Sequence, residues 1–134
     1  MKNILRTNKV AHVAMFVSDL ERSRDFYCYY FGGTAGKKYV NSFTGFQSYF
    51  IRFDFSGCQL ELMQKTGIIL QKPNEFLGLA HVAISVGSRE KVQKITAVLE
   101  FDGYQIASAP RITGDGYFES VVVDPDGILV EITV

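Results

Sequence analysis

Two stretches of this chain repeat each other about seventy residues apart, and this repeat constrains the fold more than any other feature. His12-Val13-Ala14 matches His81-Val82-Ala83 at a shift of 69 positions, and Asp54, Gly57 and Glu61 match Asp124, Gly127 and Glu131 at a shift of 70. The chain contains only two histidines. The chance that the second falls within one residue of the first one's repeat position is roughly a few per cent. The sequence therefore predicts an internal duplication.

Both halves also show the same order of predicted elements. Alternating apolar residues predict strands, apolar residues at helical spacing predict helices, and Gly, Pro, Asn and Asp mark turns. The order in each half is strand, helix, strand, strand, strand. The first half has strands over residues 10–17, 34–40, 47–55 and 58–63, with a helix from Leu20 to Tyr30 that Ser18 or Asp19 caps. The second half has strands over residues 79–86, 104–112, 118–124 and 128–134, with a helix over residues 88–101.

The predicted fold is therefore α+β, with two βαβββ modules in tandem inside one domain that covers residues 1–134. The two repeats cover about residues 9–63 and 79–134. Residues 64–78 carry no steady period and several turn residues, which is typical of a connection. A hydrophobic content of 47% is enough to build a core without disulfides or structural zinc.

Charge and hydropathy exclude several classes of partner. Fourteen basic and fourteen acidic residues leave no net charge, and the basic residues form no stripe that could neutralise phosphates, so nucleic acid is not expected. Residues 1–8 lack the following apolar run of a signal peptide, and residues 10–17 are too short to span a bilayer. The sequence thus predicts a cytoplasmic protein that does not bind membranes.

The two cysteines, Cys28 and Cys58, lie far apart and show no CxxC or Cys/His metal spacing. We expect two reduced, partly buried thiols that act as small hydrophobes. A disulfide or a catalytic nucleophile is the alternative.

Four polar residues stand out in the predicted strands. Because successive strand residues point to opposite faces, His12 and His81 point away from the helices. Glu61 and Glu131 each stand between two apolar neighbours, so each carboxylate also lies on the face opposite the helix. Taken singly, each residue could be an ordinary core or surface residue. The four together, in register within a duplicated module, favour a common site.

A carboxylate in the middle of an apolar strand must be solvated, paired or bound to a cation, since leaving it buried and bare costs several kcal/mol. A divalent metal ion would satisfy His12, Glu61, His81 and Glu131 together. Imidazole nitrogen with carboxylate oxygen suits zinc, nickel, iron, cobalt or manganese, and four protein ligands leave room for one or two waters or substrate oxygens.

These residues resemble the vicinal oxygen chelate superfamily, also called the glyoxalase, bleomycin resistance and dioxygenase superfamily, over nearly the whole chain. The supporting stretches are His12-Val13-Ala14, Ser18-Asp19-Leu20, Asp25-Phe26-Tyr27, Leu79-Ala80-His81-Val82-Ala83 and Asp124-Pro125-Asp126-Gly127 before Glu131. The resemblance implies curved mixed sheets that form an open cavity, a metal that chelates two neighbouring substrate oxygens, a small-molecule substrate and a homodimer.

The His, Glu, His, Glu set looks like that of glyoxalase I, with nickel or zinc as the expected ion. The resemblance implies a lyase or isomerase of the lactoylglutathione lyase type, which transfers a proton through a metal-chelated enediolate. In that chemistry a carboxylate removes a proton beside a carbonyl or hemithioacetal and the proton returns to the adjacent carbon. Glu131 would be the first base, and Glu61 could act from the other side.

Two positions depart from the glyoxalase I pattern. Similar bacterial proteins usually have Arg four residues after the first His and Asn four after the first Glu, to hold glutathione, whereas this chain has Phe16 and Lys65. The thiol substrate therefore stays open. A metal-dependent epimerase or thiol transferase of the same superfamily, or a metal-free resistance protein that binds a drug or metabolite, is the alternative.

Two further groups of residues have a structural and a functional interpretation. An aromatic wall for an apolar substrate or core packing would explain Phe16, Phe46, Tyr49 and Phe53 equally well. Asp124-Pro125-Asp126-Gly127 is interpreted as ordinary turn chemistry rather than catalysis.

Overall fold

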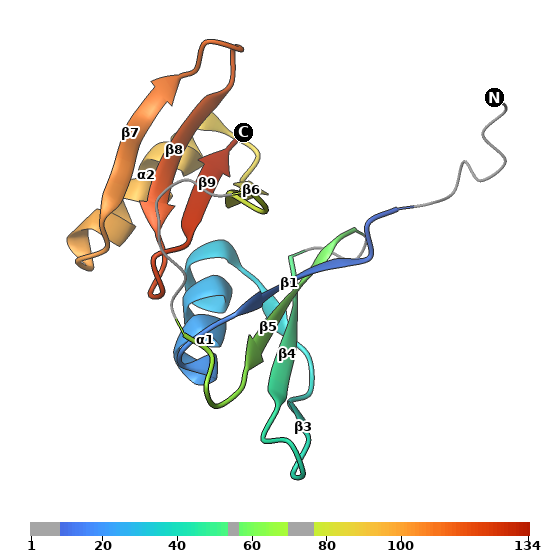
Figure 1. Cartoon of the computed structure of the whole chain (residues 1–134). Helices are drawn as coiled ribbons and strands as arrows, with labels where there is room; N and C mark the ends of the chain where they lie inside the picture. The colour runs from blue at the N-terminus through green and yellow to red at the C-terminus, as the bar shows by residue number, and fades with distance from the viewer. Residues whose placement is uncertain (1–8, 54–56, 70–76) are drawn as a thin grey trace, which may run out of the picture. The chain divides into compact units, whose positions relative to one another are not determined.

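The structure is a computed structural model that describes residues 9–53, 57–69 and 77–134. The chain divides into two compact units, residues Met1–Ile68 and Ile69–Val134. Each unit contains one copy of the predicted module (Figure 1). Asp54, one of the repeat matches, lies outside the described residues.

In its described residues, unit 1 is one helix packed on a five-stranded sheet. Its elements are β1 (His12–Phe16), α1 (Leu20–Phe31), β2 (Thr34–Ala35), β3 (Tyr39–Val40), β4 (Gln47–Arg52) and β5 (Gln59–Gln64). The sheet order is β1-β5-β4-β2, and β3 also pairs with β4. The pairing of β1 with β5 is parallel, and the other pairings are antiparallel.

Unit 2 repeats this arrangement with four strands. Its elements are β6 (His81–Ser85), α2 (Arg89–Phe101), β7 (Ile106–Ile112), β8 (Phe118–Val123) and β9 (Leu129–Thr133). The sheet order is β6-β9-β8-β7, with β6 and β9 parallel. In each unit the first strand therefore lies beside the last, although a whole module separates them in the sequence.

The predicted strand over residues 34–40 is two short strands, β2 and β3, rather than one. Gly36 still donates its backbone N–H to the carbonyl of Phe50 at 2.9 Å, so this segment stays beside β4. The ammonium group of Lys38 donates a hydrogen bond to a carboxylate oxygen of Glu21 on α1 at 2.7 Å. Residues 36–38, between β2 and β3, therefore lie beside β4 without forming a regular strand.

Both helices begin at a residue that caps them through its side chain. Asp19 Oδ1 accepts a hydrogen bond from the N–H of Arg22 at 3.0 Å, and Ser88 Oγ accepts one from the N–H of Lys91 at 3.2 Å. Such caps satisfy one of the backbone donors that a helix start leaves unpaired. Of the two predicted caps for α1, the structure uses Asp19.

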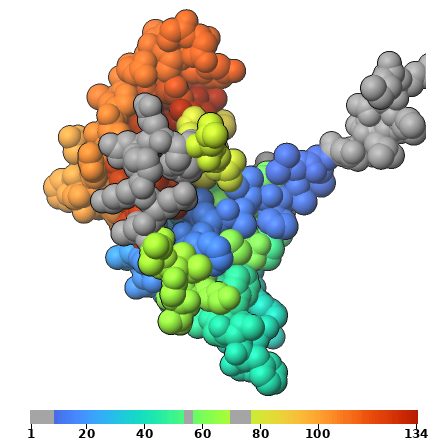
Figure 2. All heavy atoms as spheres, viewed as in Figure 1, coloured from blue at the N-terminus to red at the C-terminus, as the bar shows by residue number. Residues whose placement is uncertain are grey.

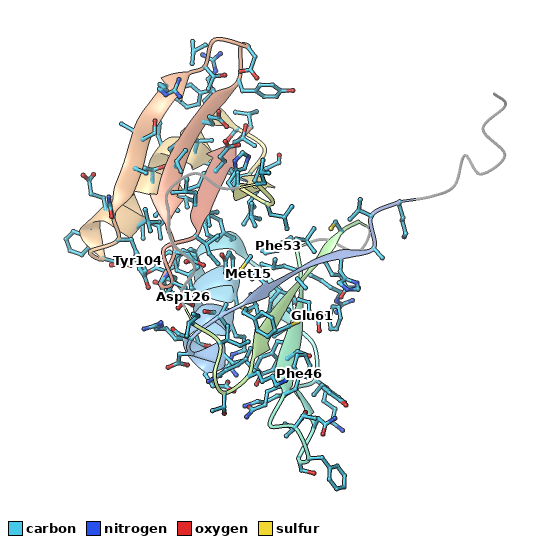
Figure 3. The ribbon with its side chains drawn as sticks, in the orientation of Figure 1. Met15, Phe46, Phe53, Glu61, Tyr104 and Asp126 are labelled. Atoms are coloured by element: carbon cyan, nitrogen blue, oxygen red, sulfur yellow. The ribbon has the colours of Figure 1, made fainter. Side chains whose placement is uncertain are left out.

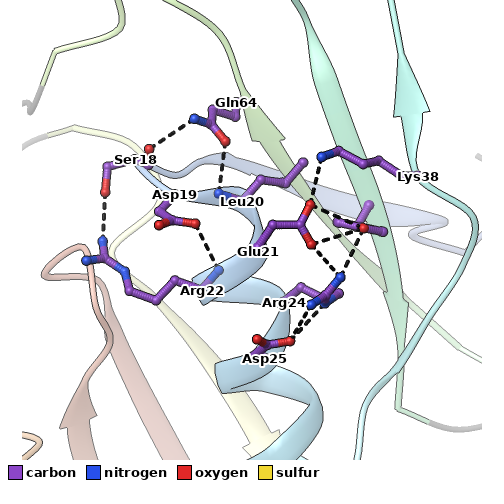
Figure 4. Close-up of polar contacts among 10 residues, drawn as sticks. Ser18, Asp19, Leu20, Glu21, Arg22, Arg24, Asp25, Lys38 and Gln64 are labelled. Carbon is purple, nitrogen blue, oxygen red and sulfur yellow. Dashed lines mark hydrogen bonds and ion pairs between the residues drawn. The ribbon is translucent and has the colours of Figure 1, made fainter.

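Gln64, at the end of β5, joins the start of α1 to the sheet (Figure 4). Its Oε1 accepts from the N–H of Leu20 at 2.9 Å, and its Nε2 donates to the carbonyl of Ser18 at 3.2 Å. The side chain of Gln64 therefore holds the β1–α1 junction, and with it the register of the strand that carries His12.

The core of each unit lies between the helix and one face of the sheet. α1 packs on β4 and β5, and α2 packs on β7, β8 and β9. Ile51, Leu60, Leu62, Val92, Leu99, Val122, Val130 and Ile132 are among the buried apolar side chains. Since strand residues alternate, burying this face leaves the residues between them on the other face of each sheet.

A hairpin of β3 and β4 projects from unit 1 (Figure 2). Its turn is shaped by Asn41, whose Oδ1 accepts from the N–H groups of Phe43 at 3.0 Å and Thr44 at 3.2 Å. This is the turn pattern typical of Asn. Phe43 at the tip is 99% exposed.

Candidate metal-binding site

The first half of the candidate site is a histidine and a glutamate on neighbouring strands of unit 1. β1 and β5 pair with Ala14 opposite Glu61, so His12 lies two residues along β1 on the same face. His12 Nε2 lies 3.6 Å from Glu61 Oε1. The side chain of His12 is 46% exposed and that of Glu61 only 14%. Figure 3 shows Glu61 on β5 among the side chains of the sheet.

The second half has the same construction in unit 2. β6 and β9 pair with Ala83 opposite Glu131, and His81 lies two residues along β6. His81 Nε2 lies 3.3 Å from Glu131 Oε2, and the side chains are 43% and 24% exposed. The sequence repeat is thus also a repeat of geometry, in which the same ring nitrogen faces a carboxylate oxygen in both copies.

Each pair lies on the face of its sheet that does not pack against the helix. The neighbours of Glu61 along β5, Leu60 and Leu62, are 3% and 0% exposed. The neighbours of Glu131 along β9, Val130 and Ile132, are both 0% exposed. The apolar neighbours therefore point into the core, and the two carboxylates point to the opposite face of their sheets.

Each unit by itself provides two ligands of the type that divalent metals use. Within the described part of either unit, no three His, Cys, Asp or Glu side chains form a group that could hold a metal ion. Structural and catalytic sites for zinc and similar ions usually take three or four protein ligands. The nitrogen and oxygen donors of each pair fit such an ion chemically, but two ligands are fewer than that number.

The surroundings of the two pairs differ. In unit 1 the ring of Phe50, which is opposite Glu61 in the β4–β5 register, meets the His12 ring edge-on with 5.2 Å between centroids. In unit 2 the Glu119 carboxyl on β8 lies beside Glu131 on β9. Burial raises the pKa of Glu119, and the negative charge of Glu131 raises it further.

Sequence reasoning missed Glu119, although a signal for it was present. On β8, Glu119 and Val121 alternate with Ser120 and Val122, which are buried against the helix side. The same alternation that assigned Glu131 to the outer face would also have assigned Glu119 there.

The aromatic residues considered for a substrate wall divide between core and surface. Tyr49 is 8% exposed and belongs to the core, whereas Phe16 is 43% exposed on the His12 face. Phe46 and Phe53 are half-buried, and the Phe46 ring lies 6.1 Å from that of Tyr39. Lys65 is exposed. Phe16 alone among the four is therefore both exposed and on the face of the candidate ligands.

The acidic turn before β9 is structural, as predicted from its composition. Asp124 is 4% exposed, and its Oδ1 accepts from the N–H groups of Asp126 at 2.8 Å and Ile128 at 2.9 Å. These two hydrogen bonds stabilise the turn, and the Asp124 carboxylate binds backbone N–H groups of the turn itself.

The two cysteines are free, as expected, but only one of them is partly buried. Cys28 is half-buried, and burial raises the pKa of its thiol. Cys58 is exposed, so the prediction of burial was wrong for this residue. It lies just before β5 rather than within the strand.

Comparison with known proteins identifies the superfamily of the chain. Residues 9–132 match the family model of the Glyoxalase/Bleomycin resistance protein/Dioxygenase superfamily. The chain belongs to this superfamily. Its α+β fold of two βαβββ modules, predicted from the sequence, is thereby confirmed.

Relatives within the superfamily include both enzymes and proteins of unknown activity. The uncharacterized protein YqjT of Bacillus subtilis (strain 168) is 29% identical over 133 residues, which cover 90% of this chain and 94% of the relative. The trypanothione-dependent glyoxalase I of Leishmania major has a TM-score of 0.75 and 26% identity, and the match covers 95% of this chain and 86% of that one. A glyoxalase family protein from Enterococcus faecalis shares the fold, with a TM-score of 0.77 and 21% identity over 96% of this chain and 98% of that one.

The described part of this superfamily member contains no helix that is long and apolar enough to cross a membrane.

Proposed function

We propose that this protein is a metal-dependent, glyoxalase I-like lyase or isomerase of a small molecule, in which His12, Glu61, His81 and Glu131 hold one divalent ion. The observation that carries the proposal is the duplicated pair: His12 with Glu61 and His81 with Glu131, each on the sheet face opposite its helix. The likeness to a glyoxalase I of 26% identity supports this choice of chemistry. Nickel and zinc are the preferred ions, with cobalt, manganese or iron as alternatives.

The burial of Glu61 supports a cation as the missing partner. Its side chain is only 14% exposed, and within the described residues its one ion-pair neighbour is His12 at 3.6 Å. A carboxylate with so little contact with water needs compensation by charge or hydrogen bonds. A divalent ion that both side chains bind would supply it.

In the proposed reaction the two glutamates move the proton. Glu131 accepts a proton from the carbon beside a carbonyl or hemithioacetal and returns it to the neighbouring carbon, and Glu61 can act from the other side. The bound ion would supply stabilisation of the oxygen charge that develops as the proton leaves. His12 and His81 hold the ion and carry no proton in the reaction. The proposal includes a homodimer located in the cytoplasm.

The test compares Glu131→Gln and Glu61→Gln with wild type in the metal-loaded protein. Because Gln keeps an oxygen ligand but cannot act as a base, we expect Glu131→Gln to retain the ion while turnover falls by about 100-fold or more. Turnover would be measured on hemithioacetals formed from an α-ketoaldehyde and a panel of thiols, with metal content measured on the same samples. Wild-type turnover in Glu131→Gln with the ion still bound would show that Glu131 is not the base.

Elemental analysis of the protein purified without added metal is the accompanying control. A stoichiometric divalent ion is expected for the enzyme. A metal-free binding module would sequester its ligand intact and would need no such ion, so a metal-free protein that still binds a small molecule would contradict the proposal.

A further inference from the structure

A row of polar side chains crosses the sheet of unit 2 beside the His81–Glu131 pair. The strand registers place Ser85 opposite Thr133, Thr133 opposite Glu119, and Glu119 opposite Arg111. Residues that pair across strands project from the same face of a sheet. Thr133 follows Glu131 by two positions on β9, so the whole row shares the face of the candidate ligands.

The corresponding row in unit 1 is largely apolar. There the registers place Phe16 opposite Met63, Met63 opposite Ser48, and Ser48 opposite Tyr39. Ser48 is 3% exposed, whereas Phe16 and Tyr39 are 43% and 54% exposed. The two copies of the module therefore keep the same His–Glu pair but differ in the row beside it.

Two groups of the polar row keep hydrogen-bonding capacity within the described residues, although Arg111 faces the Glu119 carboxyl across the β7–β8 pair. Arg111 donates from Nε to Ser108 Oγ at 3.1 Å, and in the part of the chain that the structure describes its guanidinium forms no ion pair within 4.0 Å. Thr133 Oγ1 is buried, and no described residue forms a hydrogen bond with it. A buried hydroxyl without a partner is uncommon, because the lost hydrogen bond with water is not replaced.

We propose that this row is a specificity subsite in which Arg111 binds a carboxylate group of the substrate. The inference rests on the proposed function, since it concerns the substrate of the same metal-dependent reaction. A guanidinium presents a planar pair of N–H donors that matches the two oxygens of a carboxylate.

The test uses two hydroxamic acids that differ only at the end remote from the ion. Both carry two neighbouring oxygens that chelate a divalent metal; succinic acid monohydroxamate ends in a carboxylate and butanohydroxamic acid ends in a methyl group. Calorimetric titration into the metal-loaded full chain is expected to show about tenfold tighter binding of the carboxylate probe. Arg111→Met should abolish this preference and leave the affinity of the methyl probe within about twofold.

Lys94→Met is the matched control. It also replaces one exposed cation of unit 2 with methionine, but Lys94 is on α2, which packs on the opposite face of the sheet. It should keep the tenfold preference. A preference that survives in Arg111→Met, or an equal loss for both probes, would overturn the subsite while the metal site stands. If neither probe bound any metal-loaded variant or wild type, the metal site itself would be overturned, and this inference with it.

Discussion

At the scale of single residues, Glu21 is a carboxylate that three side chains hold in unit 1. It lies in the first turn of α1 and binds Lys38 Nζ at 2.7 Å, Tyr49 Oη at 3.2 Å and the guanidinium of Arg24 (Figure 4). The hydrogen bond from Lys38 lowers the pKa of Glu21 most, and Arg24 and Tyr49 lower it further against an opposing effect of burial. These contacts tie the helix to the segment between β2 and β3 and to β4.

We therefore predict that Glu21→Gln destabilises the protein at pH 7 and does so less at pH 3. A carboxyl whose pKa is lower in the folded state stabilises the fold above its unfolded pKa, and this contribution is lost as the pH falls through the folded pKa. Since the side chain is 45% exposed, solvent screening limits the loss at pH 7 to below about 1 kcal/mol. Urea denaturation at the two pH values measures the difference.

Glu90→Gln provides the control for this prediction, because the duplicated module places Glu90 in the first turn of α2 as Glu21 is in α1. Both glutamates interact with the N-terminal end of a helix, but among the described residues only Glu21 contacts a lysine and a tyrosine. Glu90→Gln should thus cost less at pH 7. Equal losses in both variants would mean that the helix end, and not the contacts with Lys38, Arg24 and Tyr49, stabilises Glu21.

At the scale of elements, the contact of Asp19 with the start of α1 allows a prediction about helix capping. Asp19→Ala should lower the free energy of unfolding by about 1 kcal/mol, because the N–H of Arg22 loses its acceptor. Ser18→Ala is the comparison, because it removes the hydroxyl that accepts an exposed hydrogen bond from the Arg22 side chain at 2.8 Å. Thermal denaturation of both variants measures the effect. A larger loss in Ser18→Ala would show that Ser18 is the cap.

The same scale explains which features could be predicted from the sequence. The face of each strand follows from a period of two, which is local, so the sequence placed His12 and Glu61 opposite the helix correctly. The contact of Glu119 with Glu131 depends on how β8 and β9 align, which turn geometry and packing determine. The division of residues 34–40 into two strands likewise depends on contacts with distant residues of α1 and β4.

At the scale of the whole molecule, the duplication allows us to predict how many metal ions each chain binds. Each unit has one His–Glu pair, and two ligands are too few for tight binding of a divalent ion. If the two pairs share one ion, the protein should bind one ion per chain. His12→Ala and His81→Ala should each reduce the metal affinity by at least about tenfold. Metal titration followed by elemental analysis measures both quantities.

The double variant distinguishes a shared ion from two independent ones. When four ligands hold a single ion, removing the second histidine costs less after the first is gone, so the two losses are not additive. Two independent sites would instead bind two ions per chain, and each single variant would keep one of them. Cys58→Ser is the control, because Cys58 is the exposed thiol and forms no part of the proposed nitrogen and oxygen site. Cys58→Ser should leave the number of ions bound per chain and the metal affinity unchanged. Loss of the ion in that variant would mean that a thiolate, rather than one of the four proposed ligands, binds the metal.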